Sequence, residues 1–245
     1  MKKENILSKI SKMSVEELID LARSTSDAEM LNMLAINANY EVRCTVAANR
    51  NTSAEMLAVF AKDKDYEVRQ VVAWNENTPT DVLIMLAKDK DYEVRTTVAA
   101  NKHTSADTLD ILAKDKDDDV RLAVAKNENT SADVLVMLAS DKTWWVRSAV
   151  ARNKNTPIEF IAVLAQDEHR LVREQVALNE STSADVLAEL AKDVDFDVRY
   201  AVAGNKNTSV ETLVFLSKDN NEWVSKVAND ALKERKEKSK TSIER

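Results

Sequence analysis

Aspartate and arginine recur along this chain at a spacing that could support chemistry. An aspartate stands six residues before the arginine of a repeated Val-Arg dipeptide, as Asp63 does before Arg69 and Asp89 before Arg95. A carboxylate and a guanidinium can form a bidentate, charge-assisted pair, and a row of such residues could be mistaken for a catalytic site. Because both residues return in copy after copy, we expect them to form a continuous ion-pair network along the stack of repeats.

Nucleophiles and metal ligands are few. The chain has one cysteine, Cys44, and two histidines, His103 and His169, which stand where other copies carry Asn or Asp. One cysteine excludes an intramolecular disulfide framework, and this set of residues forms no convincing transition-metal site. A single glycine and two prolines exclude a P-loop or a glycine-rich dinucleotide motif. We therefore expect no catalytic residue, no metal and no cofactor.

The elements that position these residues follow from the repeat. The Val-Arg dipeptide returns every 26 residues without an insertion, and an eighth copy is Val224-Ser225. The full copies are Val42-Arg43, Val68-Arg69, Val94-Arg95, Val120-Arg121, Val146-Arg147, Val172-Arg173 and Val198-Arg199. Self-similarity at one period is typical of a solenoid, and so little Gly and Pro leaves little room for β-hairpins. The sequence predicts an all-α solenoid of about eight two-helix repeats.

The first helix of each repeat is predicted from its capping residues. In the copy that begins at Thr52, Thr-Ser-Ala-Glu is a capping box, with Thr52 accepting from the third amide and the Glu55 carboxylate reaching back. Pro79 and Pro157 follow the corresponding threonines and are expected at the first helical position.

The second helix is expected from about Tyr66 to Trp74, with Asp65 as its cap. Asn75 ends it, and we expect Asn75 in the left-handed conformation that a helix terminus often needs. The asparagine recurs in every copy and is expected to tie the turns between repeats through its side-chain amide. Neither helix reaches the ~12–15 residues needed for marginal independent stability, so both depend on stacking. The pattern does not distinguish an α-helix from a 3₁₀-helix here.

The two ends of the chain depart from the repeat. Residues 1–25 are predicted to form a capping helix that opens at a Ser14/Glu17 capping box. Residues 26–231 form the array. Residues 232–245 are rich in Lys, Glu and Arg and are expected to be a fraying helix or a disordered tail.

The full repeat pattern is present in one central copy, as Val94-Arg95, Val98-Ala99, Asn101, Thr104, Asp107, Leu109, Leu112-Ala113 and Asp115. This unit resembles the leucine-rich-repeat variant family and, through its Asp and Val-Arg element, the HEAT-like α-solenoids, over about residues 26–224. The resemblance implies a right-handed superhelix that alternates an α-helix with a second short helix, and the helix bearing Val-Arg lines the concave surface. Founding members of the family resemble iron–sulfur proteins with a cysteine cluster ahead of the repeats. Here Cys44 stands alone, so no cluster is carried over.

Charge limits the partners. The formal net charge is −7, and residues 233–245 carry six Lys or Arg against three Glu, so residues 1–232 stand at about −10. This negative charge repels a phosphate backbone, which disfavours a nucleic-acid partner. No apolar run approaches the roughly 20 residues of a membrane span, and the start of the chain has no signal-peptide core. We expect a cytoplasmic protein with no membrane segment.

The side chains that differ between copies lie at positions 67, 70 and 74 and their equivalents. Their spacing of i, i+3 and i+7 places them on one face of the second helix, and we call these positions the variable face. The amino-terminal copies carry carboxylates and one tryptophan there, whereas the carboxy-terminal copies carry aromatic and aliphatic residues. The candidate partner-binding residues are Glu67, Trp74, Glu93, Asp119, Leu122, Trp145, Arg152, Leu171, Leu178, Tyr200 and Trp223.

Exposed aromatic residues beside arginine have the composition of an interface hot spot, and the acidic copies would favour a basic segment. We predict a non-enzymatic scaffold that binds a protein or peptide, with Trp145 central to the site. One alternative is that some of these side chains fill a tightly curved inner surface. Another is a nucleic-acid-directed, DNA-glycosylase-like protein that uses Trp145, Arg152 and Asp119, against which the acidic face argues.

Overall fold

The computed structural model describes the backbone of residues 7–243 and the side chains of residues 7–237, and every regular element in that range is a helix. The chain divides into two compact units, Met1–Asn129 and Thr130–Arg245. The all-α repeat fold predicted from the sequence is confirmed, and each unit contains four repeats of two helices.

The first unit has one helix, α2, ahead of four helix pairs. Its helices are α2 (Val15–Ser24), α3 (Ala28–Leu34), α4 (Tyr40–Ala48), α5 (Ala54–Phe60), α6 (Tyr66–Trp74), α7 (Thr80–Leu86), α8 (Tyr92–Ala100), α9 (Ala106–Leu112) and α10 (Asp118–Lys126). Odd numbers from α3 mark the first helix of a repeat and even numbers from α4 the second. Both are α-helices, of 7 and 9 residues in the repeat formed by α5 and α6.

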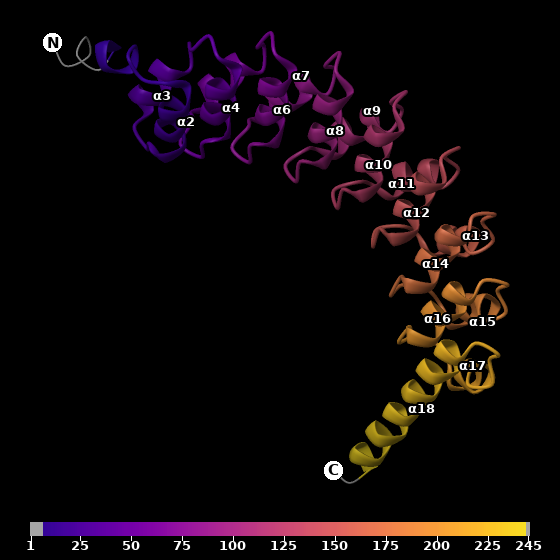
Figure 1. Cartoon of the computed structure of the whole chain (residues 1–245). Helices are drawn as coiled ribbons and strands as arrows, with labels where there is room; N and C mark the ends of the chain where they lie inside the picture. Colours follow the sequence, from indigo (N-terminus) through magenta and orange to yellow (C-terminus); the bar gives the residue numbers. More distant parts are fainter. Residues whose placement is uncertain (1–6, 244–245) are drawn as a thin grey trace. The chain divides into compact units, whose positions relative to one another are not determined.

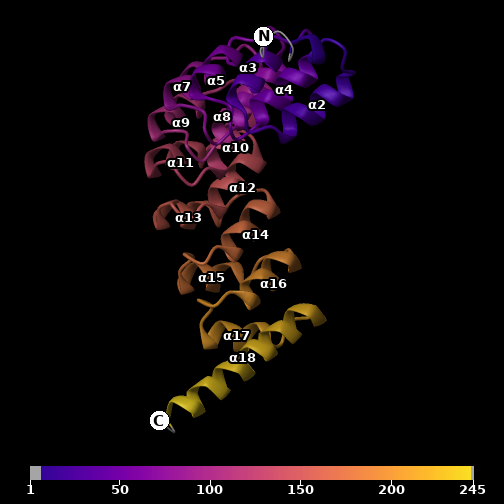
Figure 2. The same cartoon turned by 90° about the vertical axis from the view of Figure 1, so that its left-hand side faces the viewer.

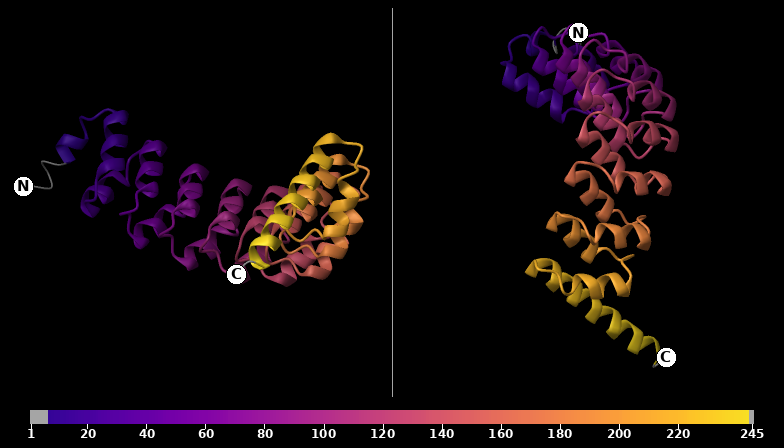
Figure 3. Two further views of the ribbon diagram at one scale, coloured as in Figure 1. Left: turned by 90° about the horizontal axis from the view of Figure 1, so that it is seen from below. Right: turned by 90° about the vertical axis from the view of Figure 1, so that its right-hand side faces the viewer.

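The second unit repeats this arrangement. Its helices are α11 (Ala132–Leu138), α12 (Trp144–Arg152), α13 (Ile158–Leu164), α14 (Arg170–Leu178), α15 (Ala184–Leu190), α16 (Phe196–Gly204), α17 (Val210–Leu216) and α18 (Glu222–Ile243). Because α18 runs without a break to Ile243, residues 232–243 continue the second helix of the last repeat (Figure 3).

Within each unit, the second helices pack directly on one another, α4 on α6 and α6 on α8 in the first unit, α12 on α14 and α14 on α16 in the second. Consecutive first helices make only slight contact with each other. In both units the first helices form one row and the second helices another (Figures 1 and 2). The second-helix row is therefore the tightly packed side of each unit.

The core follows from the apolar spacing. In one repeat, Leu57 and Phe60 from the first helix and Val68 and Val72 from the second are 3% exposed or less. Their equivalents are buried in the other repeats, because residues three and four apart lie on one side of a helix. The recurring apolar residues thus hold the layers together and leave the remaining positions to the surface.

The predicted caps of the first helices are wrong by one residue. Ser53, not Thr52, is the N-cap of α5, and its hydroxyl accepts from the amide of Met56. Pro79 and Pro157 are likewise the N-caps of α7 and α13 and not their first helical residues. The reason lies in the previous helix: the buried threonine hydroxyl donates to a carbonyl at its end, as Thr78 does to Val72 O at 2.6 Å. The capping box at Ser14 and Glu17 is confirmed.

The predicted conformation of the asparagines is also wrong. Asn75 has φ −65° and ψ 126°, an extended backbone, and no non-glycine residue with a positive φ occurs in the described part of the chain. The chain leaves the second helices from α4 to α16 by extending, because the asparagine side chain there contacts the preceding repeat. The predicted bounds of the second helix, Tyr66 to Trp74, agree with α6.

Candidate binding face

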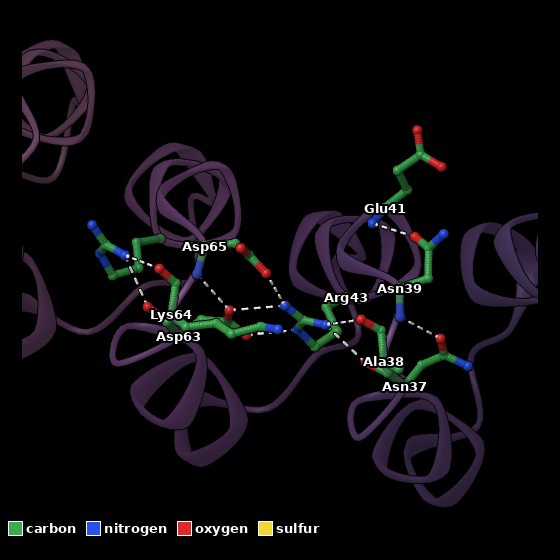
Figure 4. Close-up of polar contacts among 9 residues, drawn as sticks. Asn37, Ala38, Asn39, Glu41, Arg43, Asp63, Lys64 and Asp65 are labelled. Atoms are coloured by element: carbon green, nitrogen blue, oxygen red, sulfur yellow. Dashed lines mark hydrogen bonds and ion pairs between the residues drawn. The ribbon is translucent and has the colours of Figure 1, made fainter.

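The Asp and Arg columns form a network within each unit, but the pairing crosses repeats. Arg43 donates from Nε and Nη2 to Asp63 of the next repeat, at 2.7 and 3.0 Å (Figure 4). Its Nη1 donates to the main-chain carbonyls of Asn37 and Ala38 in its own repeat, at 2.8 and 3.0 Å. The residue six positions before the arginine therefore contributes a backbone carbonyl, and the carboxylate comes from 20 residues later in the sequence.

The same geometry recurs in both units. The Nε–Oδ2 distances are 2.6 Å for Arg69–Asp89 and Arg95–Asp115 and, in the second unit, 2.6 Å for Arg147–Asp167. Burial alone would raise the pKa of Asp89, but the bonds from Arg69 and from the amide of Asp91 outweigh it, and its pKa lies below the ordinary value. These carboxylates are thus held ionised by a buried guanidinium, which is a structural role.

The asparagine column makes the predicted contacts between repeats. The Nδ2 of Asn75 donates to Ala47 O at 2.7 Å, and that of Asn101 donates to Ala73 O at 2.7 Å. In the second unit, Asn205 donates to Ala177 O at 2.7 Å and to Asn179 O at 3.0 Å. Arginine, aspartate and asparagine columns are all occupied in holding the stack, so they do not form the functional surface.

None of the positions of the variable face is buried. In the first unit, α6 carries Glu67 and Trp74, α8 carries Glu93, and α10 carries Asp119 and Leu122. Trp74 is 65% exposed. Glu67 and Glu93 are half-buried and Asp119 is exposed, and among the described residues none of the three carboxylates forms an ion pair.

Hollows flank Trp74 because its neighbours in the same column, Ala48 and Ala100, are small. One hollow of about 1080 Å³ is lined by Cys44, Ala48 and Trp74 together with the loops that follow α2, α4 and α6. A smaller one of about 190 Å³ lies between Trp74, Ala100 and Lys102. A third, of about 400 Å³, brings Glu93, Asp119 and Leu122 together.

The variable face of the second unit carries several large apolar side chains that are accessible. Trp145 on α12 is 38% exposed, Leu178 on α14 52%, Tyr200 on α16 46% and Trp223 on α18 58%. Leu171 is half-buried and Arg152 is exposed. These side chains therefore do not fill the interior between layers. Gly204 adds open space beside them, since a Cβ there would meet nothing within 4 Å.

Trp145 is held in place by aromatic contacts. Its ring meets that of Trp144 edge-on, with centroids 5.5 Å apart and planes at 86°. Trp144 in turn stacks on His169, which precedes α14, at 4.0 Å and 8°. Trp145 therefore contacts an aromatic stack that links α12 to the residue before α14. The sequence pattern places Trp144 in an aromatic column that is expected to pack at the edges of the repeats, but it does not reveal the contact with His169.

Some polar groups of the second-unit face interact with neighbouring side chains. Arg170 pairs with Asp197 at 2.9 Å across α14 and α16. Glu174, between Leu171 and Leu178 on α14, has a raised pKa because it is partly buried and because Asp197 lies near. The Lys226 ammonium lies 6.0 Å from the ring centroid of Trp223. Large apolar side chains are therefore more numerous on the variable face of the second unit than on that of the first.

Cys44 lies on the first-unit face, half-buried beside the hollow at Trp74. Burial, followed by the charge of Glu67, raises the pKa of its thiol to about 11. Within the part of the chain that the structure describes, no three His, Cys, Asp or Glu side chains are grouped to hold a metal ion. In the same range, no helix combines the length and apolar character that a membrane span requires.

Sequence analysis missed a second exposed apolar column, on the first helices. In the first unit it consists of Val59, Met85 and Ile111, and in the second of Met137, Val163 and Phe215, with Glu189 as an interruption. The signal in the sequence is an apolar residue directly before the last residue of most first helices, as Val59 stands before Phe60.

Stacked two-helix repeats, joined by buried ion-pair and amide ladders, define an α-helical repeat solenoid. Among solved structures, the chain is similar to a leucine-rich repeat variant described as having a novel repetitive structural motif, with 28% identity and a TM-score of 0.64. The similarity covers 89% of this chain and 83% of the other. The resemblance to that family is thus confirmed.

The fold is also that of a second solved protein. The X-ray structure of YibA from E. coli matches over 91% of this chain and 98% of its own, with 22% identity and a TM-score of 0.52. No protein-family model matches the sequence, and no curated protein does.

Proposed function

We propose that this protein is a non-enzymatic scaffold that holds a protein or peptide on the variable face of its second helices. The observation that carries this proposal is a division of labour between positions. Residues that recur in every copy are buried in contacts between repeats, whereas residues that differ are accessible. A surface that varies on a constant frame is what a solenoid uses for recognition.

The two faces suggest how the partner is recognised. Trp145, Leu178 and Tyr200 are large and accessible, and Trp145 also contacts the ring of Trp144. Large apolar and aromatic side chains of this kind often act as anchors that dominate binding energy. A partner would bury an apolar segment against them. The unpaired carboxylates of the first unit would attract a basic segment, increase the association rate and set its orientation.

The decisive experiment is comparative affinity capture followed by measurement with the purified partner. Wild-type protein should retain a partner that the Trp145→Ala/Tyr200→Ala variant loses. A matched control, Val163→Ala/Phe215→Ala, removes exposed apolar side chains from the first-helix row of the same unit and should bind like wild type. If calorimetry gives the two double variants the same affinity for that partner, the variable face is not the binding surface.

A further inference from the structure

One recess on the first-unit face lies mainly between α8 and α10. It has a volume of about 400 Å³, at the small end of ligand sites, which run from about 300 to 1,000 Å³. Its lining includes Tyr92, Glu93, Thr96, Asp119, Leu122 and Lys126. The recess lies wholly within the first unit and combines residues of α8 and α10 with Gln70 from α6.

One side of the recess is acidic. Glu93 and Asp119 occupy the same position in consecutive repeats, and neither carboxylate forms an ion pair within residues 7–237. Their field reaches the neighbouring phenol: the charge of Glu93, with burial and the charges of Asp117 and Asp119, raises the pKa of Tyr92. A cation entering here would therefore meet two carboxylates that no side chain of the described chain neutralises.

Another side of the recess is apolar. Leu122 lines it together with Ala100 and Ala123, and Leu122 stands at a position that holds Cys44, Gln70 and Thr96 in the earlier repeats. Hydrocarbon beside carboxylates suits a side chain that carries its charge at the end of a methylene stem, as lysine and arginine do. A hydrated metal ion would make no favourable contact with the leucine side chain.

One hydroxyl group in the lining of the recess makes no hydrogen bond. Helical threonines commonly donate to the carbonyl four residues earlier, as Thr97 does to Glu93 O at 2.8 Å. The Thr96 Oγ1 is buried and has no hydrogen-bond partner. It can accept a hydrogen bond from a donor that displaces its neighbours slightly on entering the recess.

Lys126 places a positive charge at one end of the recess, away from the two carboxylates. It lies seven residues after Asp119 on α10, about 10 Å along the helix axis, and is exposed. Its ammonium would repel a cation at that end and attract a carbonyl of the partner's main chain. The cationic group is thereby directed to the end where Glu93 and Asp119 lie.

We propose that this recess binds one lysine or arginine side chain of the partner, with the stem against Leu122 and the charged group between Glu93 and Asp119. This assignment rests on the proposed binding function and adds a specific requirement to it.

The test is a titration of the full chain, labelled with ¹⁵N, by N-acetyl-lysine amide and N-acetyl-arginine amide. We expect saturable shifts of amide resonances in residues 92–100 and 119–126. N-acetyl-norleucine amide, which has the stem without the charge, should cause none of comparable size. Glu93→Gln/Asp119→Asn should weaken binding about ten- to a hundredfold, the effect of losing charge-assisted hydrogen bonds. Leu122→Asn should weaken it while both carboxylates remain.

The control variant Asp81→Asn/Asp107→Asn changes the net charge equally, on the first-helix row, and should bind like wild type. The proposal is overturned by shifts that spread over all acidic residues without saturating, by equal effects of the two double variants, or by no shift at all. Loss of the captured partner in Trp145→Ala/Tyr200→Ala, together with any of these results, would remove the recess assignment and leave the binding function standing. If the two amides cause specific shifts but affinity capture retains no partner, the recess remains a site for basic side chains and the proposed binding function is removed.

Discussion

Replacing Asp89 by alanine removes one link of the ion-pair ladder in the middle of the first unit. Asp89 accepts from Arg69 at 2.6 and 2.9 Å and from the amide of Asp91 at 2.9 Å. The Arg69 and Asp89 side chains are only 6% and 8% exposed. The substitution therefore leaves a buried guanidinium without its counter-ion.

Removing one partner of a buried pair costs about 3–5 kcal/mol. Arg69 keeps its bonds to the carbonyls of Asp63 and Lys64, at 2.8 and 3.2 Å. These remaining contacts place the expected loss at the low end, about 3 kcal/mol. The assay is urea unfolding followed by circular dichroism at 222 nm, with the free energies compared where the m values agree.

Two further variants test the reasoning. Asp81→Ala makes the same chemical change at an exposed position in the first turn of α7 and should cost less than about 1 kcal/mol. Arg69→Met/Asp89→Leu replaces both partners by apolar side chains and should be about 2 kcal/mol more stable than Asp89→Ala, because no unpaired charge remains. A loss for Asp89→Ala no larger than that for Asp81→Ala would refute the buried-pair argument, and so would a double variant at least as unstable as Asp89→Ala.

The remaining predictions concern pH, reactivity and partners. The ladder carboxyls have a folded-state pKa below the unfolded value of about 3.9, so the unfolded chain takes up more protons than the folded chain as the pH falls. The stability present above about pH 4 should therefore be lost as the pH falls through the folded pKa values. Calorimetry at pH 6, 4 and 3 should show this loss. With a pKa of about 11 against an ordinary 9.0, the Cys44 thiol should react with Ellman's reagent at pH 8 about a hundredfold more slowly than in urea-unfolded chain, and Glu67→Gln should speed it; equal folded and unfolded rates would contradict the burial. Trp145→Ala/Tyr200→Ala should lower the Tm by less than about 5 °C, whereas a larger fall would place these residues in the core. Duplex DNA should give no gel shift at low salt, and a salt-dependent shift would favour the glycosylase-like alternative.

The parts of the fold that sequence reasoning predicted correctly are those decided by local periodicity. The second helix from Tyr66 to Trp74 follows from Val68 and Val72 at helical spacing, and the structure has α6 at those bounds. The distinction between recurring and variable positions also follows from the printed sequence. The binding role of the variable positions stays a prediction, because spacing shows which side chains lie on one face and not what they contact.

The errors occurred where a local choice depends on a neighbouring repeat. Thr52 and Ser53 both have hydroxyls that can cap a helix, and Ser53 caps because Thr52 is occupied by a carbonyl at the end of α4. The asparagines extend for the same kind of reason, since their amides reach the previous repeat. Neither contact lies within one repeat, so no pattern within a single repeat could reveal it.

By itself, the sequence determined the period, the two helices of each repeat, their buried sides and which side chains are left for the surface. Only the tertiary structure decided that Arg43 pairs with Asp63, which lies 20 residues later, and not with a carboxylate of its own repeat. The physical reason is that all copies of a periodic sequence offer the same residues, so the pattern does not show which copy a given side chain contacts. Stacking removes that ambiguity, and in doing so it brings Glu93, Asp119 and Leu122 around one recess.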